Sequence, residues 1–210
     1  MPGPIVWALE GVIRAENAWM NPSYPLGLSE TSIIIGDHVT PNRYVQAGFI
    51  NYPNDGPTLF AQVTGGPGDA PNTYYAGFFG VPPSPVAITE SSNYAIEAAF
   101  NYPSDYFQIK INGQVWLGGF VGSVPGTYGA PFKLMNLNAG ISSSKSNQVM
   151  GTAGASNRAY VVAAKWYDSL NWGNFSGDQY EKEANFPGDY VSPLGSNWMY
   201  VWDNSPYCNY

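Results

Sequence analysis

The chain has 210 residues, of which 44% are hydrophobic and only 11% are charged, so its composition excludes the highly charged, poorly hydrophobic type of disordered protein. Fifteen acidic residues against eight basic ones give a formal charge of −7, and the basic residues are scattered, which excludes nucleic acid and anionic membranes as expected partners. No apolar run approaches the length of a membrane span.

Glycine and proline punctuate the whole chain. The 24 Gly and 18 Pro separate short runs that contain most of the 7 Trp, 16 Tyr and 10 Phe, and no amphipathic helix is evident. We therefore predict an all-β protein of short antiparallel strands joined by tight turns, folded as one domain over residues 1–210. Residues 160–210 are expected to form a loop-rich, aromatic-rich C-terminal extension packed on it.

The first alternating run covers residues 6–14 and predicts a strand that carries Glu10 beside Ala8 and Val12. Glu10 has two interpretations. It belongs either to a solvated strand face, which we favour because surface strands often carry Glu, or to a catalytic pair.

Residues 44–50 predict a half-buried strand. Its alternation places Val45, Ala47 and Phe49 on one face, and the opposite face carries Tyr44, Gln46, Ile50 and Tyr52. Gly48 lets another group approach beside Gln46. Gln46 is therefore our first candidate for a functional amide, with Tyr44 and Tyr52 as candidate ligand-binding residues; a structural amide is the alternative.

Residues 93–101 and 106–112 predict a hairpin. A symmetric turn pairs Phe100 with Phe107 and Ile96 with Ile111, and it sets Glu97 across from Lys110. Glu97 is accordingly either part of an exposed cross-strand ion pair or a catalytic carboxylate on an open sheet face.

Asn112 and Gly113 form a two-residue turn signal, so a third strand is expected over residues 114–121. Trp116 should then face away from Val115 and Leu117, and it is a candidate ligand-binding residue.

Aromatic residues dominate the end of the chain. Alternation over residues 197–202 places Trp198, Tyr200 and Trp202 on one strand face. Such a row either caps the core or binds sugar rings or proline-rich peptide.

Several blocks share the order and spacing of a known family. They are Asn17 to Pro22, Gly27 to Ser29 running into Ile33 to Gly36, Val45 to Phe49 with Tyr52 and Pro53, Tyr94 to Phe100, Gly113 to Gly122, and Met135 with Ala139 and Gly140. Met150 with Gly151 and the late Cys208 fit as well. On these blocks the chain resembles the neprosin domain, a glutamic prolyl-endopeptidase-like family that is distantly similar to the eqolisin glutamic peptidases.

The resemblance implies a β-sandwich in which an acidic pair acts on peptide bonds. Neprosins look to have Glu where this chain has Gln46, and eqolisins use Gln there. At the second acidic segment this chain reads Leu137 to Ile141, with apolar residues at both acidic positions. The general-base carboxylate is therefore expected to be missing.

Other site chemistries find little support in the sequence. Cys208 is the only cysteine and His38 the only histidine, so a zinc cluster or an intrachain disulfide cannot form and a nucleophilic dyad would depend on His38 alone. We expect no metal and no cofactor.

Localisation follows from weaker signals. The start of the chain lacks a signal peptide, and we interpret Met1 as replacing a removed segment of a secreted protein; Asn174 begins one glycosylation sequon.

Three functions remain open. The favoured one is a secreted neprosin-like protein with a degenerate acidic site, which acts as a binding or structural module. Its expected ligand is a polypeptide, which could be proline-rich, or a glycan, and self-association is left open. The first alternative is an acid-active glutamic endopeptidase of proline-related specificity that uses Gln46 with Glu97 or Glu10. The second alternative is a lectin-like protein that binds glycan on the Trp198, Tyr200 and Trp202 face.

Overall fold

The computed structural model of the protein describes residues 7–16, 28–36, 43–51, 56–65, 72–75, 86–101, 106–120, 134–142, 159–174, 189–192 and 199–203. These segments form thirteen β-strands and no helix. No described segment is a helix long and apolar enough to cross a membrane.

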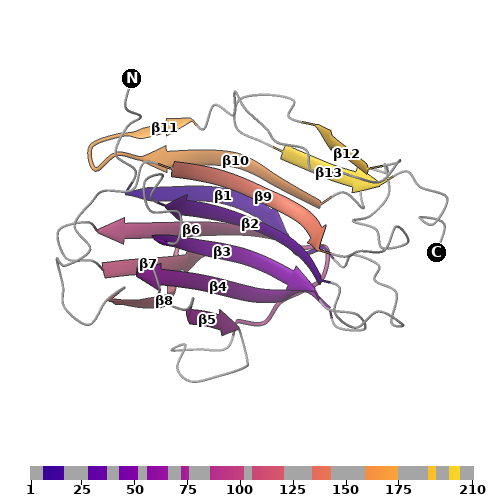
Figure 1. Cartoon of the computed structure of the whole chain (residues 1–210), viewed down its shortest axis with the longest axis horizontal. Helices are drawn as coiled ribbons and strands as arrows, with labels where there is room; N and C mark the ends of the chain where they lie inside the picture. The colour runs from indigo at the N-terminus through magenta and orange to yellow at the C-terminus, as the bar shows by residue number, and fades with distance from the viewer. Residues whose placement is uncertain are drawn as a thin grey trace.

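The strands form two sheets that lie one on the other with their strands roughly aligned (Figure 1), and every pair of neighbouring strands is antiparallel. The larger sheet has the order β12 (Asp189–Ser192), β13 (Met199–Asp203), β10 (Ala159–Tyr167), β1 (Ala8–Arg14), β6 (Asn93–Asn101), β7 (Tyr106–Ile111) and β8 (Gln114–Phe120), with β11 (Trp172–Asn174) paired to β10. The smaller sheet has the order β5 (Asn72–Tyr75), β4 (Thr58–Gly65), β3 (Arg43–Asn51), β2 (Leu28–Gly36) and β9 (Leu134–Ser142).

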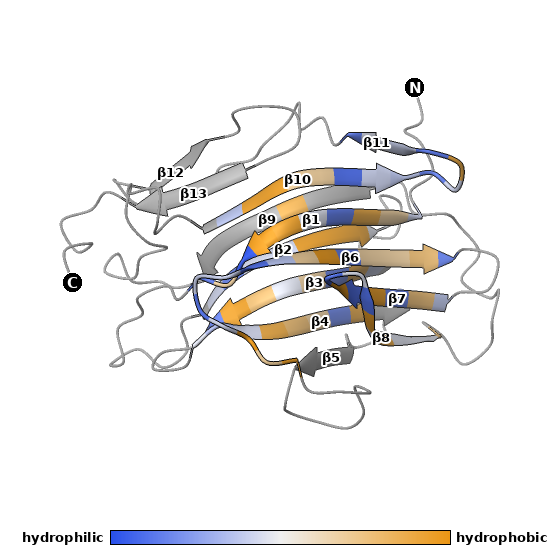
Figure 2. Cartoon of the chain, turned by 180° about the vertical axis from the view of Figure 1, so that it is seen from behind, coloured by the Kyte–Doolittle hydropathy of each residue, from blue (hydrophilic) through white to orange (hydrophobic). Residues whose placement is uncertain are grey.

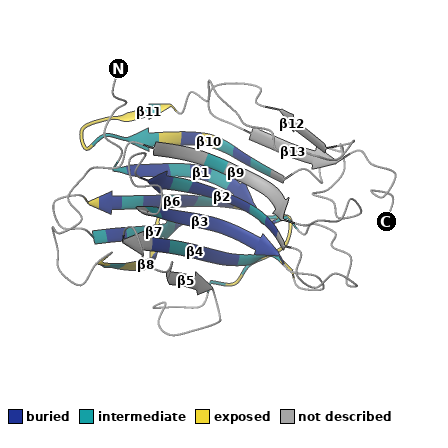
Figure 3. Cartoon of the chain, in the orientation of Figure 1, coloured by how far each residue is buried: buried dark blue, intermediate teal, exposed yellow. Residues whose placement is uncertain are grey.

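The core lies between the two sheets. Alternate residues of β1 and β6, such as Leu9 and Ile96, are fully buried, and so are Ile33 and Val45 from β2 and β3 of the opposing sheet. The central strands of both sheets are accordingly the most deeply buried (Figure 3). The all-β, antiparallel, single-domain prediction is confirmed.

The central hairpin has the predicted register. Phe100 pairs with Phe107 and Glu97 with Lys110, and β8 follows a tight turn at Asn112 and Gly113. Both turn residues have positive φ, 49° and 77°, which is the conformation that an Asn-Gly hairpin turn requires.

The predicted orientation of Trp116 is wrong. The pairing of β7 with β8 runs from Ile109 opposite Leu117 to Lys110 opposite Val115, so Trp116 is the extra residue of a β-bulge. The bulge places Trp116 and Leu117, both buried, in the same core.

The C-terminal strands continue the larger sheet. β10 lies between β13 and β1 and contributes the fully buried Val161 to the core. Of the three aromatic residues predicted to share a face, Tyr200 and Trp202 are on β13, where the structure describes the backbone only, and Trp198 lies outside the described residues.

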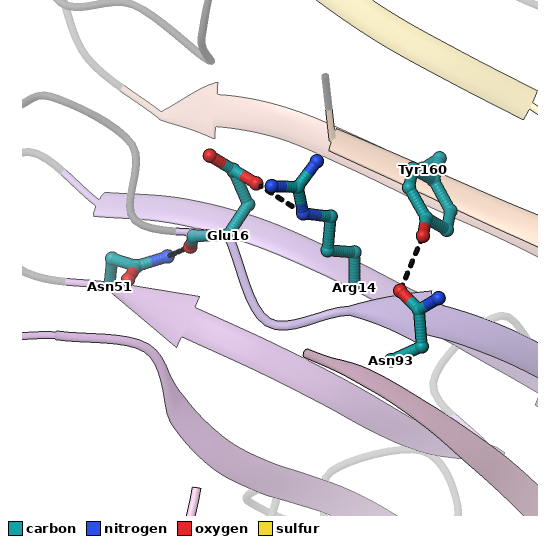
Figure 4. A network of polar contacts seen from close by, with 5 residues as sticks. All are labelled: Arg14, Glu16, Asn51, Asn93 and Tyr160. Atoms are coloured by element: carbon teal, nitrogen blue, oxygen red, sulfur yellow. Dashed lines mark hydrogen bonds and ion pairs between the residues drawn. The ribbon is translucent and has the colours of Figure 1, made fainter. Parts of the chain in front are cut away.

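A polar network joins the two sheets at one end of the sandwich (Figure 4). The Asn51 amide, at the end of β3, donates to the backbone oxygen of Glu16, just beyond β1, at 2.9 Å. The Glu16 carboxylate lies 3.0 Å from Arg14 Nε, and both side chains are about nine-tenths buried. Tyr160 on β10 donates to Asn93 on β6 in the same region.

The pKa of Glu16 is raised from 4.5 to about 7. Burial is the main cause; the positive charge of Arg14 opposes the shift and the negative charge of Glu90 adds to it.

Candidate functional site

The candidate site lies on the face of the smaller sheet that points away from the core. Gln46 on β3 stands between Ile34 on β2 and Gln62 on β4. Its neighbours Val45 and Ala47 are in the core, so Gln46 faces outward, as predicted. Gln46 is nevertheless only 6% exposed, which gives its amide a largely water-free setting.

Gln46 contacts a carboxylate and a hydroxyl from the neighbouring strand. Its Nε2 donates to Glu30 Oε1 and to Ser32 Oγ, the latter at 2.9 Å. The Ser32 hydroxyl donates in turn to Glu30 Oε1 at 2.7 Å. Ser32 is fully buried and Glu30 is half-buried. The three side chains therefore form a closed hydrogen-bonded triangle, which we call the Glu30–Ser32–Gln46 triad.

Two small residues allow this triangle to form. In the strand register Gln46 lies opposite Ile34, and Glu30 lies opposite Ile50, four positions away along β3. The pair between them is Ser32 and Gly48, so no large side chain separates Glu30 from Gln46.

Gly48 also lets another group, Ser32 of β2, approach beside Gln46, as predicted. A Cβ at this position would lie only 2.5 Å from Ser32 Cα and 2.7 Å from Ser32 Cβ, and it would also strike the carbonyl oxygen of Thr31. Any larger residue would therefore push β2 away from β3 at the triad.

A second polar pair flanks the triad. Tyr44, two residues before Gln46, donates its hydroxyl to Gln62 Oε1 at 3.0 Å. Burial and, to a lesser extent, the negative charge of Glu30 raise the pKa of Tyr44 above its usual value of 10.0. The phenol therefore stays protonated and remains a hydrogen-bond donor within the field of the carboxylate.

A carboxylate lies beside Gln46, although the segment that the resemblance singled out for one has apolar residues at both acidic positions. The strand β9 carries Leu137 and Ile141 and pairs with β2. In this register Leu137 lies opposite the core residue Ile33 and packs against the core, and Ile141 lies opposite Ser29. An apolar residue on the core side of β9 does not determine which side chains lie on the outward face of the smaller sheet. The carboxylate on that face is Glu30, supplied by β2.

Sequence analysis therefore missed Glu30 and Ser32, together with Gln62. A signal for the first two was present: Glu30 and Ser32 alternate with Thr31 and Ile33, as the polar side of a half-buried strand does.

The alternative carboxylates lie on the other sheet. Glu97 and Glu10 are on the face of the larger sheet that points away from the core, where Glu97 forms a 2.7 Å ion pair with Lys110 and Glu10 pairs in register with Lys165. Hydrophilic bands cross β10 and β1 of this sheet (Figure 2). The structure does not bring either residue to Gln46, because the core separates the two faces.

The remaining candidates are distributed as follows. Tyr44 belongs to the site, whereas Trp116 is only 3% exposed and lies in the core, where its Nε1 has no hydrogen-bond partner. Tyr52 lies outside the described residues. Among the residues whose positions are described, no three His, Cys, Asp or Glu side chains are grouped so as to hold a metal ion.

Comparison with known proteins gives likenesses of structure only. No family model matches the sequence, and no curated protein matches it. The fold is similar to that of scytalido-glutamic peptidase, solved with a transition state analog inhibitor, with a TM-score of 0.61 and 10% identity over 97% of this chain and 95% of that one. It is also similar to SCP-B, a member of the eqolisin family of peptidases solved with the tripeptide Ala-Ile-His, with a TM-score of 0.57 and 9% identity over 97% of this chain and 94% of that one.

At such low identity these likenesses concern the fold alone. They support a distant eqolisin-like β-sandwich, and they do not support the neprosin family specifically.

Proposed function

We propose that the chain is an acid-active endopeptidase of the glutamic type, in which Glu30 and Gln46 act together on a peptide bond. The observation that carries the proposal is the direct hydrogen bond from the buried Gln46 amide to the Glu30 carboxylate. A fold similar to peptidases solved with a transition state analog and with a tripeptide supports polypeptide as the substrate class.

In the first step Glu30 acts as the general base. Its carboxylate takes a proton from a water molecule, whose oxygen forms a bond to the carbonyl carbon of the peptide. The carbonyl π electrons move to the oxygen, which becomes an oxyanion. The Gln46 amide is the donor that stabilises this charge, and its burial makes that hydrogen bond stronger than it would be in water.

In the second step Glu30 acts as the general acid. It returns the proton to the peptide nitrogen, the oxyanion reforms a carbonyl, and the carbon–nitrogen bond breaks. The products are a carboxylic acid and an amine, and Glu30 is again a carboxylate. Because water attacks directly, no covalent intermediate with the protein forms.

Acid activity fits a second property of the fold. The raised pKa of Glu16 makes the folded state bind a proton more tightly than the unfolded chain does, so the sandwich gains stability toward acid pH.

Proline-related specificity and export from the cell belong to the same proposal. They rest on the resemblance and on composition.

The proposal replaces the interpretation as a degenerate binding module, because that interpretation depended on a missing carboxylate. The hydrogen bond from Gln46 to the Glu30 carboxylate supports the peptidase instead. The glycan-binding alternative depends on Trp198, Tyr200 and Trp202, whose side chains lie outside the described part of the structure, and no observation favours it.

The test is proteolysis of an unfolded, proline-rich protein across about pH 2 to 8, the range in which carboxyl groups change protonation. The wild type should cleave it at acid pH, and Glu30→Gln and Gln46→Ala should each lose at least roughly 100-fold in kcat/KM. Glu97→Gln, a matched change of a half-buried acid on the other sheet, is the control. Cleavage that persists in Glu30→Gln, or no cleavage by a folded wild type, would overturn the proposal.

A further inference from the structure

We propose that Ser32 is a positioning residue, which fixes the Gln46 amide so that one particular amide hydrogen is delivered to the substrate. This inference rests on the proposed function for its catalytic meaning, and on the geometry of the Glu30–Ser32–Gln46 triad for its structural content.

The Gln46 amide has as many hydrogens as it has neighbouring acceptors. The Gln46 amide nitrogen carries two hydrogens. One lies on Glu30 Oε1 and the other on Ser32 Oγ, so the resting site has no free amide hydrogen for a substrate oxygen. Before Gln46 can stabilise an oxyanion, one of these two hydrogen bonds must be exchanged.

Ser32 and Glu30 together fix the orientation of the Gln46 amide. The hydroxyl hydrogen of Ser32 is committed to Glu30 at 2.7 Å, so Ser32 Oγ can only accept a hydrogen bond from Gln46. Glu30, as a carboxylate, also only accepts. Both neighbours therefore require the nitrogen end of the Gln46 amide, and an amide turned end for end would place its oxygen against two acceptors.

The change of charge on Glu30 during the reaction determines which Gln46 amide hydrogen is released. When Glu30 takes a proton from water it becomes neutral, and a neutral acceptor holds an amide hydrogen less strongly than a charged one does. Ser32 does not change its charge during the reaction. The hydrogen on Glu30 is therefore the one released to the developing oxyanion, while the hydrogen on Ser32 stays in place and keeps the amide from rotating.

Burial explains why the hydroxyl has no substitute. Ser32 is fully buried, and it stands opposite Gly48, where the two strands are in close contact. A side chain so far from solvent is not readily replaced by water when its hydroxyl is removed. Loss of the hydroxyl should leave one Gln46 hydrogen without an acceptor and Glu30 with one donor fewer.

The kinetic test compares Ser32→Ala with the matched control Ser29→Ala. Ser29 is also buried on β2 but binds Asn51 instead of the triad. Ser32→Ala should lower kcat by roughly 10- to 100-fold with KM changed by less than about threefold, as expected for a misplaced catalytic group. Ser29→Ala should change neither quantity.

A second readout does not depend on activity. In the NMR spectrum of the wild type, both side-chain amide hydrogens of Gln46 should exchange slowly with water. In Ser32→Ala one of them should lose its protection, because its acceptor is gone. Ser32→Cys keeps the size of the side chain with a weaker hydrogen-bonding group, so it should show smaller changes in the same direction and serves if Ser32→Ala fails to fold.

The two proposals fail in different ways. A wild type that shows the NMR behaviour but cleaves nothing would refute the peptidase and leave the role of Ser32 in the triad intact. A wild type that cleaves, together with a Ser32→Ala variant of unchanged kcat and unchanged Gln46 exchange, would refute the positioning role alone.

Discussion

Replacing Glu16 by Gln should remove a loss of stability that the wild type suffers as the pH rises toward neutrality. The buried Glu16 carboxyl has a pKa of about 7, against 4.5 when unperturbed. Between these values the folded state holds a proton that the unfolded chain has released. The free energy of unfolding therefore falls as the pH rises through this window and is highest below the unfolded value.

The magnitude follows from the size of the shift. Each pKa unit corresponds to about 1.36 kcal/mol, so the change from 4.5 to about 7 sets an upper limit of about 3.4 kcal/mol. The side chain keeps 11% of its surface exposed, so water can reach it and reduce this value. We expect about 2 kcal/mol, a substantial part of the stability of a single domain.

The assay is urea unfolding of the wild type and Glu16→Gln at about pH 4, 5.5 and 7.5. The stability of the variant relative to the wild type should rise by about 2 kcal/mol across this range, whatever the substitution costs at a single pH. Glu10→Gln, a matched change of a half-buried acid on β1, controls for an effect of removing any acid. A relative stability that is flat within about 0.5 kcal/mol, or that falls with pH, would refute the reasoning.

Three further substitutions test the site and its surroundings. Gly48→Ala should cost about 3 kcal/mol or more in urea unfolding, because its Cβ would lie within 2.7 Å of Ser32 atoms, and a near-neutral result would contradict the close packing. Glu97→Gln should cost at most about 1 kcal/mol and leave proteolysis unchanged, because the ion pair with Lys110 is partly solvated; lost cleavage would move the catalytic acid to the larger sheet. Tyr44→Phe should leave the tyrosinate absorbance near pH 10 almost unchanged, because the Tyr44 phenol ionises above that pH, and a difference already present there would contradict its environment.

The sequence predicted the parts of the fold that depend on neighbouring residues. The register that pairs Phe100 with Phe107 follows from one turn and from apolar pairs on either side of it. The outward orientation of Gln46 likewise follows from the alternation of a single strand. Trp116 escaped prediction because one extra residue in β8 reverses the alternation, and nothing in its immediate sequence marks the bulge.

The proposed catalytic partner of Gln46 could not be predicted in the same way. Glu30 reaches Gln46 only through the pairing of β2 with β3, and in that register it lies opposite Ile50. Their contact depends on Ser32 and Gly48 leaving room between them, which is a property of two strands together. The resemblance directed attention to Leu137 on β9, which the register places on the core side.

Glu30 and Gln46 are proposed to act as a single catalytic unit, and a double-mutant cycle measures this coupling directly. We would determine kcat/KM at acid pH for the wild type, Glu30→Gln, Gln46→Ala and the double variant on one peptide substrate. Residues that act as a unit give strongly non-additive effects, so the double variant should be hardly slower than either single variant. Losses that simply multiply, or single variants as active as the wild type, would contradict the central claim.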